Sequence, residues 1–415
     1  MKKGWQTKPL ADLCEVFADG DWIENKDQSP EGIRLIQTGN VGEGVFKDRG
    51  EKARYISEAT FKRLRCTEIL EGDCLISRLP DPAGRSCLLP DTGERMITAV
   101  DCTIVRFNRK QAFPEFFNYY SQSRDYLSTV DGETTGTTRK RISRSKLAQT
   151  LIPVPPLPEQ QRIVGILDEA FEGIATAKAN AGKNLKNART LFDSHLQSVF
   201  TRRSDEVPLL RLASEITDGD HSPPPKAPTG VPFITISDIV KRTREVDFSN
   251  TFTVPAEYFL KLKPNKKPRV GDILYTVTGA TLGIPVLVKE HRDFCFQRHI
   301  GLIRPNPDTD SAWLTYGLLS PQVFRQATIG STGAAQKTVS LSVLRGLKLP
   351  KLALPEQKRI AARLDSLAAE THRLESIYQQ KLVALDELKK SLLHQAFSGQ
   401  LTMDNGQRAM RKSVS

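Results

Sequence analysis

Two loops, one in each half of this 415-residue chain, carry side chains that could hold a phosphate or a base edge. The first loop covers residues 132–146, and the second covers residues 330–337. Their candidate binding residues are Arg139, Lys140, Arg141, Arg144, Gln336 and Lys337. Arginine and lysine neutralise phosphates, arginine also makes bidentate contacts to guanine, and glutamine can read adenine. These residue types predict binding to a polyanion rather than the making or breaking of a bond.

A second pair of loops follows a predicted strand in each half, at residues 77–85 and 276–283. Their candidate binding residues are Ser77, Arg78, Arg85, Thr276, Thr278 and Thr281. Small donors and glycines allow close backbone approach to phosphates or base edges. A solvated turn is the simpler interpretation of any single loop, but matching positions in the two halves favour binding. The basic segment at residues 261–269 keeps the solvated interpretation.

Catalytic and metal-binding motifs are missing from the sequence. It holds no G-x-x-x-x-G-K-[ST], G-x-G-x-x-G or H-E-x-x-H pattern. The run Ser222-Pro223-Pro224-Pro225 resembles the catalytic loop of amino-methyltransferases, but proline stands where that loop has its aromatic ring. The six cysteines are scattered without a C-x-x-C pair, which argues against zinc and suits a reducing compartment. We therefore expect no catalytic residue, metal site or bound cofactor in this chain.

The elements that must position these loops occur twice in the sequence, as an internal repeat. Leu157-Pro-Glu-Gln-Gln-Arg-Ile163 recurs as Leu354-Pro-Glu-Gln-Lys-Arg-Ile360, and the match continues without a gap to Phe200 and Phe397. Upstream, the repeat is looser: Asp19-Gly-Asp21 corresponds to Asp218-Gly-Asp220, for example. A divergent module is thus followed each time by a better-matched helix. This asymmetry suggests two modules with different targets on one common frame.

Each repeated helix begins with a proline, Pro158 or Pro355, and carries apolar residues at alternating steps of four and three. The residues expected to pair the helices are Ile163, Leu167, Ile174, Leu364, Leu367, Leu374, Leu385 and Leu388. Short links at the helix ends favour an antiparallel coiled coil with a module at each end. In that pairing Asn184 would lie beside Thr371, and we expect a polar contact there.

The expected fold class is α+β: two target-recognition domains separated by two long helices that form an antiparallel coiled coil, with a pseudo-two-fold internal repeat. The expected segments are a first module at 1–153, a first spacer helix at 154–204, a second module at 205–350, a second spacer helix at 351–400 and a flexible tail at 401–415. Lys and Arg outnumber Asp and Glu by 60 to 48, so the net charge is +12, which favours a polyanionic partner. There is neither a long apolar run nor a signal-peptide core, so we expect a cytoplasmic protein.

The repeated L-P-E-Q-[QK]-R-I helix starts, each after a β-rich module with a G-D-[CI]-L-[IY] strand and a loop rich in Ser or Thr and Gly, resemble specificity subunits of type I restriction–modification systems. The resemblance runs from about Trp5 to Gln400. It implies that each module reads half of a bipartite double-stranded DNA target and that the helices bind two modification subunits. It also implies S-adenosylmethionine-dependent adenine methylation, and ATP- and magnesium-dependent cleavage if restriction subunits join, all in partner chains. The alternative is a coiled-coil scaffold whose modules bind proteins or other ligands.

Overall fold

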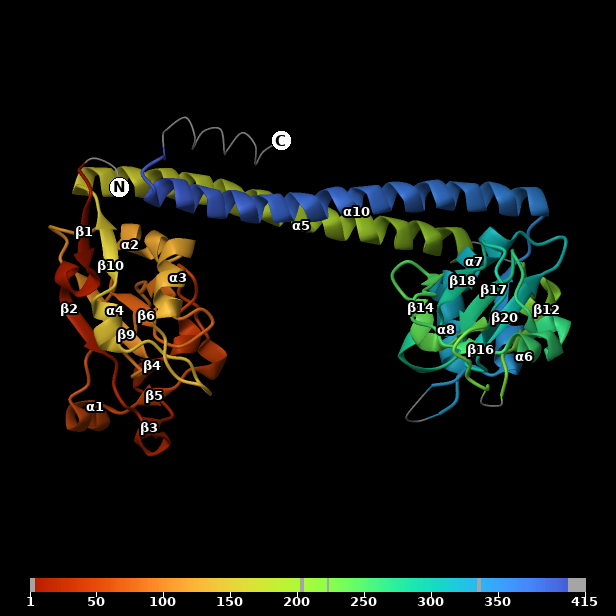
Figure 1. Ribbon diagram of the computed structural model, residues 1–415, viewed down its shortest axis with the longest axis horizontal. Helices are drawn as coiled ribbons and strands as arrows, with labels where there is room; N and C mark the ends of the chain where they lie inside the picture. The colour runs from red at the N-terminus through yellow and green to blue at the C-terminus, as the bar shows by residue number, and fades with distance from the viewer. Residues whose placement is uncertain (1–3, 202–204, 222–223, 334–336, 402–415) are drawn as a thin grey trace. The chain divides into compact units, whose positions relative to one another are not determined.

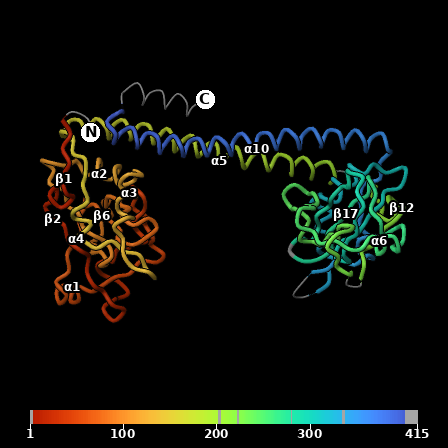
Figure 2. Tube along the Cα trace, in the orientation of Figure 1, coloured from red at the N-terminus to blue at the C-terminus, as the bar shows by residue number. Residues whose placement is uncertain are grey.

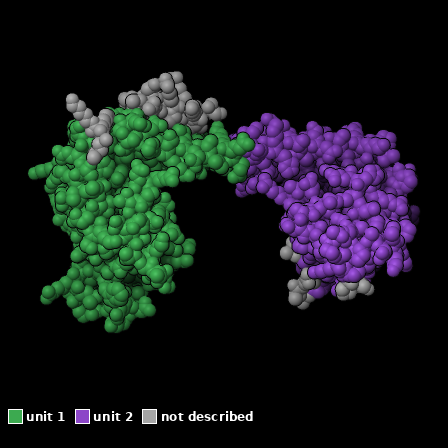
Figure 3. Space-filling model, viewed as in Figure 1, with its two compact units in different colours: residues 1–182, 379–415 green, residues 183–378 purple. Residues whose placement is uncertain are grey.

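The computed structural model describes residues 4–201, 205–221, 224–333 and 337–401. The chain forms two compact units, residues 1–182 with 379–415 (unit 1) and residues 183–378 (unit 2), as Figure 3 shows. Each unit therefore contains one module and parts of both long helices. Gln336, the run at Ser222 and Pro223, and the expected tail beyond residue 401 lie outside the described residues.

Module 1 is built on a four-stranded antiparallel sheet of order β2-β9-β6-β7. These strands are β2 (Cys14–Asp19), β6 (Cys74–Ser77), β7 (Ser86–Leu88) and β9 (Cys102–Phe107). A second sheet holds β3 (Gln28–Ser29), β5 (Tyr55–Ile56), β4 (Ile33–Ile36) and β8 (Met96–Thr98), and β1 (Gln6–Pro9) pairs with β10 (Leu151–Val154). The helices of this module are α1 (Glu58–Leu64), α2 (Pro114–Tyr120), α3 (Arg124–Gly132) and α4 (Arg144–Ala148).

Module 2 repeats this plan with the strand order β12-β20-β17-β18. These strands are β12 (Ala213–Asp218), β17 (Ile273–Thr276), β18 (Pro285–Leu287) and β20 (Ile300–Pro305). Smaller sheets hold β16 (Thr253–Val254), β13 (Val231–Ile234) and β19 (Cys295–Phe296); β14 (Ile239–Val240) with β15 (Glu245–Val246); and β11 (Glu206–Pro208) with β21 (Lys348–Pro350). Its helices are α6 (Ala256–Lys261), α7 (Ser311–Leu319), α8 (Pro321–Gly330) and α9 (Leu341–Gly346). The α+β class and the internal repeat are confirmed.

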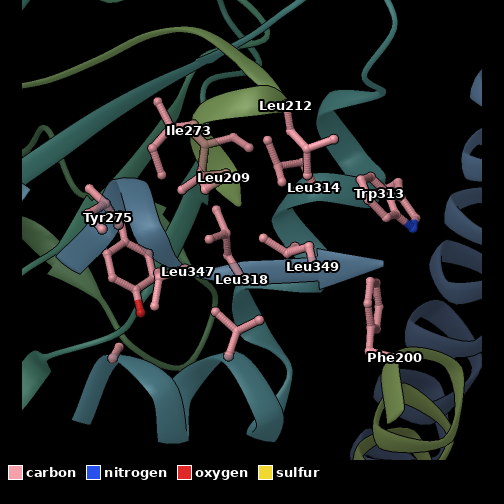
Figure 4. Close-up of a cluster of buried hydrophobic side chains, with 14 of the residues drawn as sticks. Phe200, Leu209, Leu212, Ile273, Tyr275, Trp313, Leu314, Leu318, Leu347 and Leu349 are labelled. Carbon is pink, nitrogen blue, oxygen red and sulfur yellow. The ribbon is translucent and has the colours of Figure 1, made fainter. Parts of the chain in front are cut away.

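One inner strand of each main sheet, β17 or β6, begins with three buried apolar residues because it has a core on both faces. Along β17, Ile273 and Tyr275 enter one cluster, and Leu274, pointing the other way, enters another. Figure 4 shows the first cluster, in which Leu314 and Leu318 of α7 and Leu349 of β21 meet that face of the sheet. Strand β6 repeats the pattern, with Cys74 and Ile76 on one side and Leu75 on the other.

The repeated G-D pair has a structural role in both modules. Asp73 is 1% exposed and accepts hydrogen bonds from Arg106 Nε at 2.8 Å and Arg106 Nη2 at 2.7 Å. Asp272 is bound in the same way by Arg304, at 2.9 and 2.7 Å. These bonds raise the pKa of both arginines. The repeated aspartate therefore fixes the start of the strand, β6 or β17, that leads into the loop at residues 77–85 or 276–283.

The long helices are α5 (Leu157–Thr201) and α10 (Leu354–Phe397), drawn as ribbon and tube in Figures 1 and 2. In unit 1 the start of α5 packs on the end of α10, with Ile163, Leu167 and Ile174 in one cluster with Leu385 and Leu392. In unit 2 the end of α5 packs on the start of α10. The two helices are therefore antiparallel. Of the expected pairing residues, Ile163, Leu167, Ile174, Leu364 and Leu385 are buried, and Leu367, Leu374 and Leu388 are half-buried.

The expected contact between Asn184 and Thr371 is wrong. Asn184 is exposed, and the Thr371 hydroxyl donates to the carbonyl oxygens of Leu367 and Ala368 on its own helix, at 2.9 Å each. The buried positions of α5 run Ala181, Leu185, Ala188, so the apolar seam steps by four past Asn184. Leucine at 185 takes the buried place because its removal from water is favourable, whereas an amide there would need a partner.

No helix among the described residues is long and apolar enough to cross a membrane.

Candidate nucleic-acid interface

Each module is fixed to its helix by a buried glutamine of the repeated L-P-E-Q start. Gln160 is 1% exposed; its Oε1 accepts from Phe113 N at 2.8 Å, and its Nε2 donates to Gln111 O and Pro155 O at 3.1 and 2.8 Å. Gln357 makes the same three bonds in unit 2, to Asp310 N, Asp308 O and Leu352 O. The glutamine is therefore identical in both copies because its three hydrogen bonds connect the helix to the module. We call this connection the joint.

A tyrosine–aspartate bond and an aromatic contact complete each joint. Tyr119 donates to Asp168 Oδ1 at 2.5 Å, and Tyr316 donates to Asp365 Oδ1 at 2.6 Å. Burial and these hydrogen bonds raise the pKa of both tyrosines, so the phenols stay protonated donors at neutral pH. The end of the other helix also contributes: Phe397 packs edge-on to Phe116 in unit 1, and Phe200 packs on Trp313 in unit 2.

The candidate loops occupy the same place in both modules, because their backbone hydrogen bonds correspond one to one. Arg78 N donates to Asp101 O at 2.9 Å, as Val277 N does to His299 O at 3.0 Å. Arg78 O accepts from Ile142 N at 3.1 Å, and Val277 O accepts from Val339 N at 2.8 Å. The bridges Thr135–Arg141 and Thr332–Thr338 also correspond. Residue 101 therefore matches 299, and residue 141 matches 338.

In module 1 this place is filled by arginines and two aspartates. Arg141 Nε lies 3.1 Å and Arg139 Nη2 3.8 Å from the Asp101 carboxylate. Arg144 Nε lies 3.9 Å from Asp19 Oδ2. Lys140 is exposed and makes no ion pair with any described residue. The four predicted residues Arg139, Lys140, Arg141 and Arg144 therefore lie at one surface. We call these four residues, together with Asp19 and Asp101, the arginine cluster.

Three predicted residues of the neighbouring loop face inward instead. Ser77 is fully buried, and its hydroxyl donates to Leu79 O at 3.1 Å. Arg78 is 3% exposed, donates to Val100 O, and lies 3.2 Å from Asp19. Burial lowers the pKa of Arg78, and Arg141 and Arg144 add to this effect. Arg85 donates to the carbonyl oxygens of Leu79, Pro82, Val41 and Thr38, at 2.7 to 3.0 Å.

The expectation of direct contact from these three side chains is therefore corrected. Their donors already satisfy carbonyl and carboxylate groups of the protein, and a buried group that loses its partner costs about 1–3 kcal/mol. They shape the loop and support the arginine cluster. A sequence pattern could not distinguish these roles, because the carbonyl groups that Arg85 binds come from two separate loops.

In module 2 the same place is a cleft of about 330 Å³. Its polar lining is Asp218, His221, Thr278, Arg298, His299, Thr338 and Ser340. His221 Nε2 lies 2.7 Å from Asp218 Oδ2, and Arg298 Nε donates to His299 Nε2 at 3.4 Å. Burial, with Arg298 alongside, lowers the pKa of His299, so this imidazole is neutral at neutral pH and can accept or donate.

Of the predicted threonines of module 2, Thr278 lines this cleft, whereas Thr276 and Thr281 are not among its lining residues. The Thr278 hydroxyl lies 3.1 Å from that of Thr338. Thr276 is 1% exposed, with its hydroxyl bound to Thr281 O, so direct contact from this residue is also corrected. The Thr281 hydroxyl is buried without a hydrogen-bond partner among the described residues. Lys337 is exposed and lines a second, larger groove of about 1050 Å³.

Sequence reasoning missed three groups of residues, the first of which is the part of the module 2 cleft formed by Arg298, His299, Thr338 and Ser340. The aspartates of the clusters, Asp19, Asp101 and Asp218, were not identified as site residues, although Asp19 and Asp218 belong to a recognised repeat. The basic turn Lys241-Arg-Thr-Arg244 was also missed, and it lines the larger groove. Three cations in four residues were a usable signal, because a hairpin turn places them together.

Comparisons with known proteins agree on one family. The family model described as the type I restriction modification DNA specificity domain matches residues 2–184 and 220–382. The chain is 25% identical over 317 residues to the EcoBI specificity subunit of Escherichia coli, covering 68% of this chain and 65% of that protein, which is less than two thirds of its length. It is 22% identical to the putative MjaX specificity subunit of Methanocaldococcus jannaschii, covering 96% of this chain and 93% of that protein. A structure solved in a study of type I R-M system assembly and conformational transition matches 97% of this chain and 99% of its own, with a TM-score of 0.75 at 21% identity.

Proposed function

Because this chain belongs to the type I restriction modification DNA specificity family, we propose that it is the non-catalytic subunit that selects the DNA sequence on which a type I complex acts. Each module reads one half of a bipartite double-stranded target. The chain is not itself an enzyme; the chemistry belongs to the subunits that assemble with it.

One observation carries this proposal: the two modules hold different polar side chains at the same place on the same frame. Asp101 and Arg141 in module 1 stand where His299 and Thr338 stand in module 2. Arginine, histidine, threonine and carboxylate groups present different donors and acceptors to a base edge. A fixed frame with exchanged contact residues is what two different half-sites require.

The partners follow from the family and remain part of the proposal. Two modification subunits dock on helices α5 and α10, whose outward residues are exposed along their length. Those subunits supply adenine methylation with S-adenosylmethionine, and restriction subunits, where present, supply cleavage with ATP and magnesium. The chain itself needs no cofactor. We place the complex in the cytoplasm, where its six free cysteines stay reduced.

Selection from a random duplex pool tests the proposal. The full chain, alone and with type I modification subunits, is incubated with random-sequence duplex, and the retained DNA is sequenced. We expect one two-part motif with a constant gap. No enrichment in either preparation would instead favour a scaffold whose modules bind other ligands.

Exchange of two residues should alter only one half-site. The double variant Asp101→His, Arg141→Thr puts the module 2 side chains into module 1 and leaves the backbone frame intact. Since a bidentate base contact contributes about 1–3 kcal/mol of discrimination, affinity for the original first half-site should fall roughly 10- to 100-fold. The second half-site is the internal control and should be recovered unchanged. A first half-site that also stays unchanged would contradict the assignment of these residues as readers.

A further inference from the structure

Module 2 contains a large basic groove, and the cationic turn at its rim has no basic counterpart in the sequence of module 1. It has a volume of about 1050 Å³ and lies between the turn from β14 to β15 and helix α8, which are neighbours in Figure 1. Its cationic rim is formed by Lys241, Arg244 and Lys337, and its apolar wall by Leu282, Ile284 and Phe324. We call this site the basic groove and include Arg242, which is exposed on the same turn.

The local backbone holds this groove in shape. Arg244 adopts a left-handed conformation with φ of 56° and donates from its N to Val240 O at 2.8 Å, which closes the turn. Its guanidinium lies over the Phe192 ring at 5.8 Å. On the opposite side, Gly283 has φ of 86°, and a Cβ there would come within 2.5 Å of the Phe324 ring. Glycine therefore lets Phe324 pack closely against the loop.

The cations of the basic groove are not neutralised by the protein. Lys241, Arg242 and Lys337 make no ion pair with any described residue, and neither does the adjacent Glu245. In module 1 the corresponding hairpin, in which Val41 pairs with Phe46 as Ile239 pairs with Val246, has the shorter turn Glu43-Gly44, which carries one acid and no cation. The loop cations of module 1 are mostly paired: Arg139 and Arg141 with Asp101, Arg144 with Asp19, and Lys146 with Glu133 at 3.0 Å.

This difference has a thermodynamic consequence for binding a polyanion. A free cation that meets a phosphate releases a condensed counterion, so each such contact adds about 0.9 to the salt slope of the binding constant. An arginine already paired with a carboxylate adds less to the salt slope, because the carboxylate repels the incoming phosphate. Such an arginine is instead held in one orientation, which suits contact to a base edge.

We propose that the basic groove of module 2 binds the DNA phosphate backbone and supplies most of the salt-dependent affinity, whereas the arginine cluster of module 1 contributes mainly sequence discrimination. This inference rests on the proposed function. It makes the two half-sites unequal: one module anchors the duplex, and the other contributes less to the anchoring.

Two charge-matched variants test this division. Lys241→Gln, Arg242→Gln, Lys337→Gln removes three charges from module 2, and Arg139→Gln, Lys140→Gln, Arg141→Gln removes three from module 1. Affinity of the complete chain with its modification subunits is measured from 50 to 300 mM salt, on the recovered target and on unrelated duplex. We expect the slope of log K against log salt to fall by roughly two to three in the first variant and by about one or less in the second, in which only Lys140 is unpaired.

A third variant controls for net charge. Lys261→Gln, Lys263→Gln, Arg269→Gln removes three exposed cations from the segment at residues 261–269 and should change the slope by less than one. Thermal unfolding shows whether each variant is folded, which we expect since most of the replaced side chains are exposed. Equal slope changes in the module 1 and module 2 variants, or a larger change in module 1, would overturn the inference. A wild-type assembly that enriches no sequence would instead contradict the proposed function itself.

Discussion

Inserting one heptad into helix α5 alone, after Gly182, should reduce affinity for the bipartite target by roughly 10²- to 10⁴-fold. The insertion lengthens one partner of an antiparallel pair and leaves α10 unchanged, so the packing of Ile163, Leu167 and Ile174 on α10 cannot persist together with the packing of Phe200 on module 2. If the two half-sites can no longer be engaged at once, the advantage of linked binding is lost. Fluorescence anisotropy with the selected target measures this loss.

A second heptad, inserted after Tyr378 of α10, should restore tight binding to a different target. Seven residues keep the apolar seam and add about 10 Å of helix. This length corresponds to roughly three base pairs at 3.4 Å each. Repeated selection should therefore return the same half-sites with a longer gap. A seven-residue insertion after Asp91, in an exposed loop of module 1, is the control and should leave the gap as it was. An unchanged gap in the double insertion would mean that the helices do not set the spacing.

Replacing Gln160 with alanine should destabilise unit 1 by about 3 kcal/mol or more. The side chain is buried and satisfies one backbone N–H and two backbone carbonyl groups. Each buried group left without a partner costs about 1–3 kcal/mol, and the truncation also opens a cavity. Denaturant unfolding gives the free energy, and hydrogen exchange at Phe113 N reports the joint directly.

The adjacent Gln161 provides the matched control, because it is exposed on the same turn of α5. Gln161→Ala should change the unfolding free energy by less than about 0.5 kcal/mol. Gln357→Ala should reproduce the effect in unit 2, with Asp310 N as the exchange probe. Equal stability of the Gln160 and Gln161 variants would show that the repeated glutamine is not the joint. If the Gln160 variant no longer selects the first half-site but still selects the second, the joint is required for sequence recognition by module 1.

The sequence was sufficient for the frame because the frame is repeated and periodic. A helix start such as Leu157-Pro158-Glu159 and a sustained apolar seam are local signals, and helix α5 begins at Leu157. The antiparallel direction followed from short connections, and the core clusters agree with it. The predicted seam was wrong at two positions of α5: Leu185 rather than Asn184 is buried, and Phe192 rather than Leu191, because the steps of four and three fall one residue later than expected.

The site was less accessible to sequence reasoning because it depends on pairs distant in the chain. Arg141 meets Asp101 across forty residues, and Arg85 turns inward to carbonyl groups near Thr38 and Val41. Charge alone suggested that every arginine in these loops faces a ligand. Burial and hydrogen bonding separated them: Arg78 is buried and Arg85 donates to four carbonyl groups, so both build the loop, whereas Arg139 and Arg144 remain exposed. The basic turn at Lys241 was missed because its counterpart in module 1 is not basic.

A map of methylated adenine tests the central claim most directly. The chain is expressed with type I modification subunits in a host without adenine methylation of its own, and the genome is sequenced by a method that detects N6-methyladenine. We predict methylation at one bipartite motif with a constant gap, absent when this chain is omitted, and a changed first half-site for the Asp101→His, Arg141→Thr variant. Methylation that does not depend on the chain, or whose sites share no two-part motif, would contradict the claim that this protein selects the target.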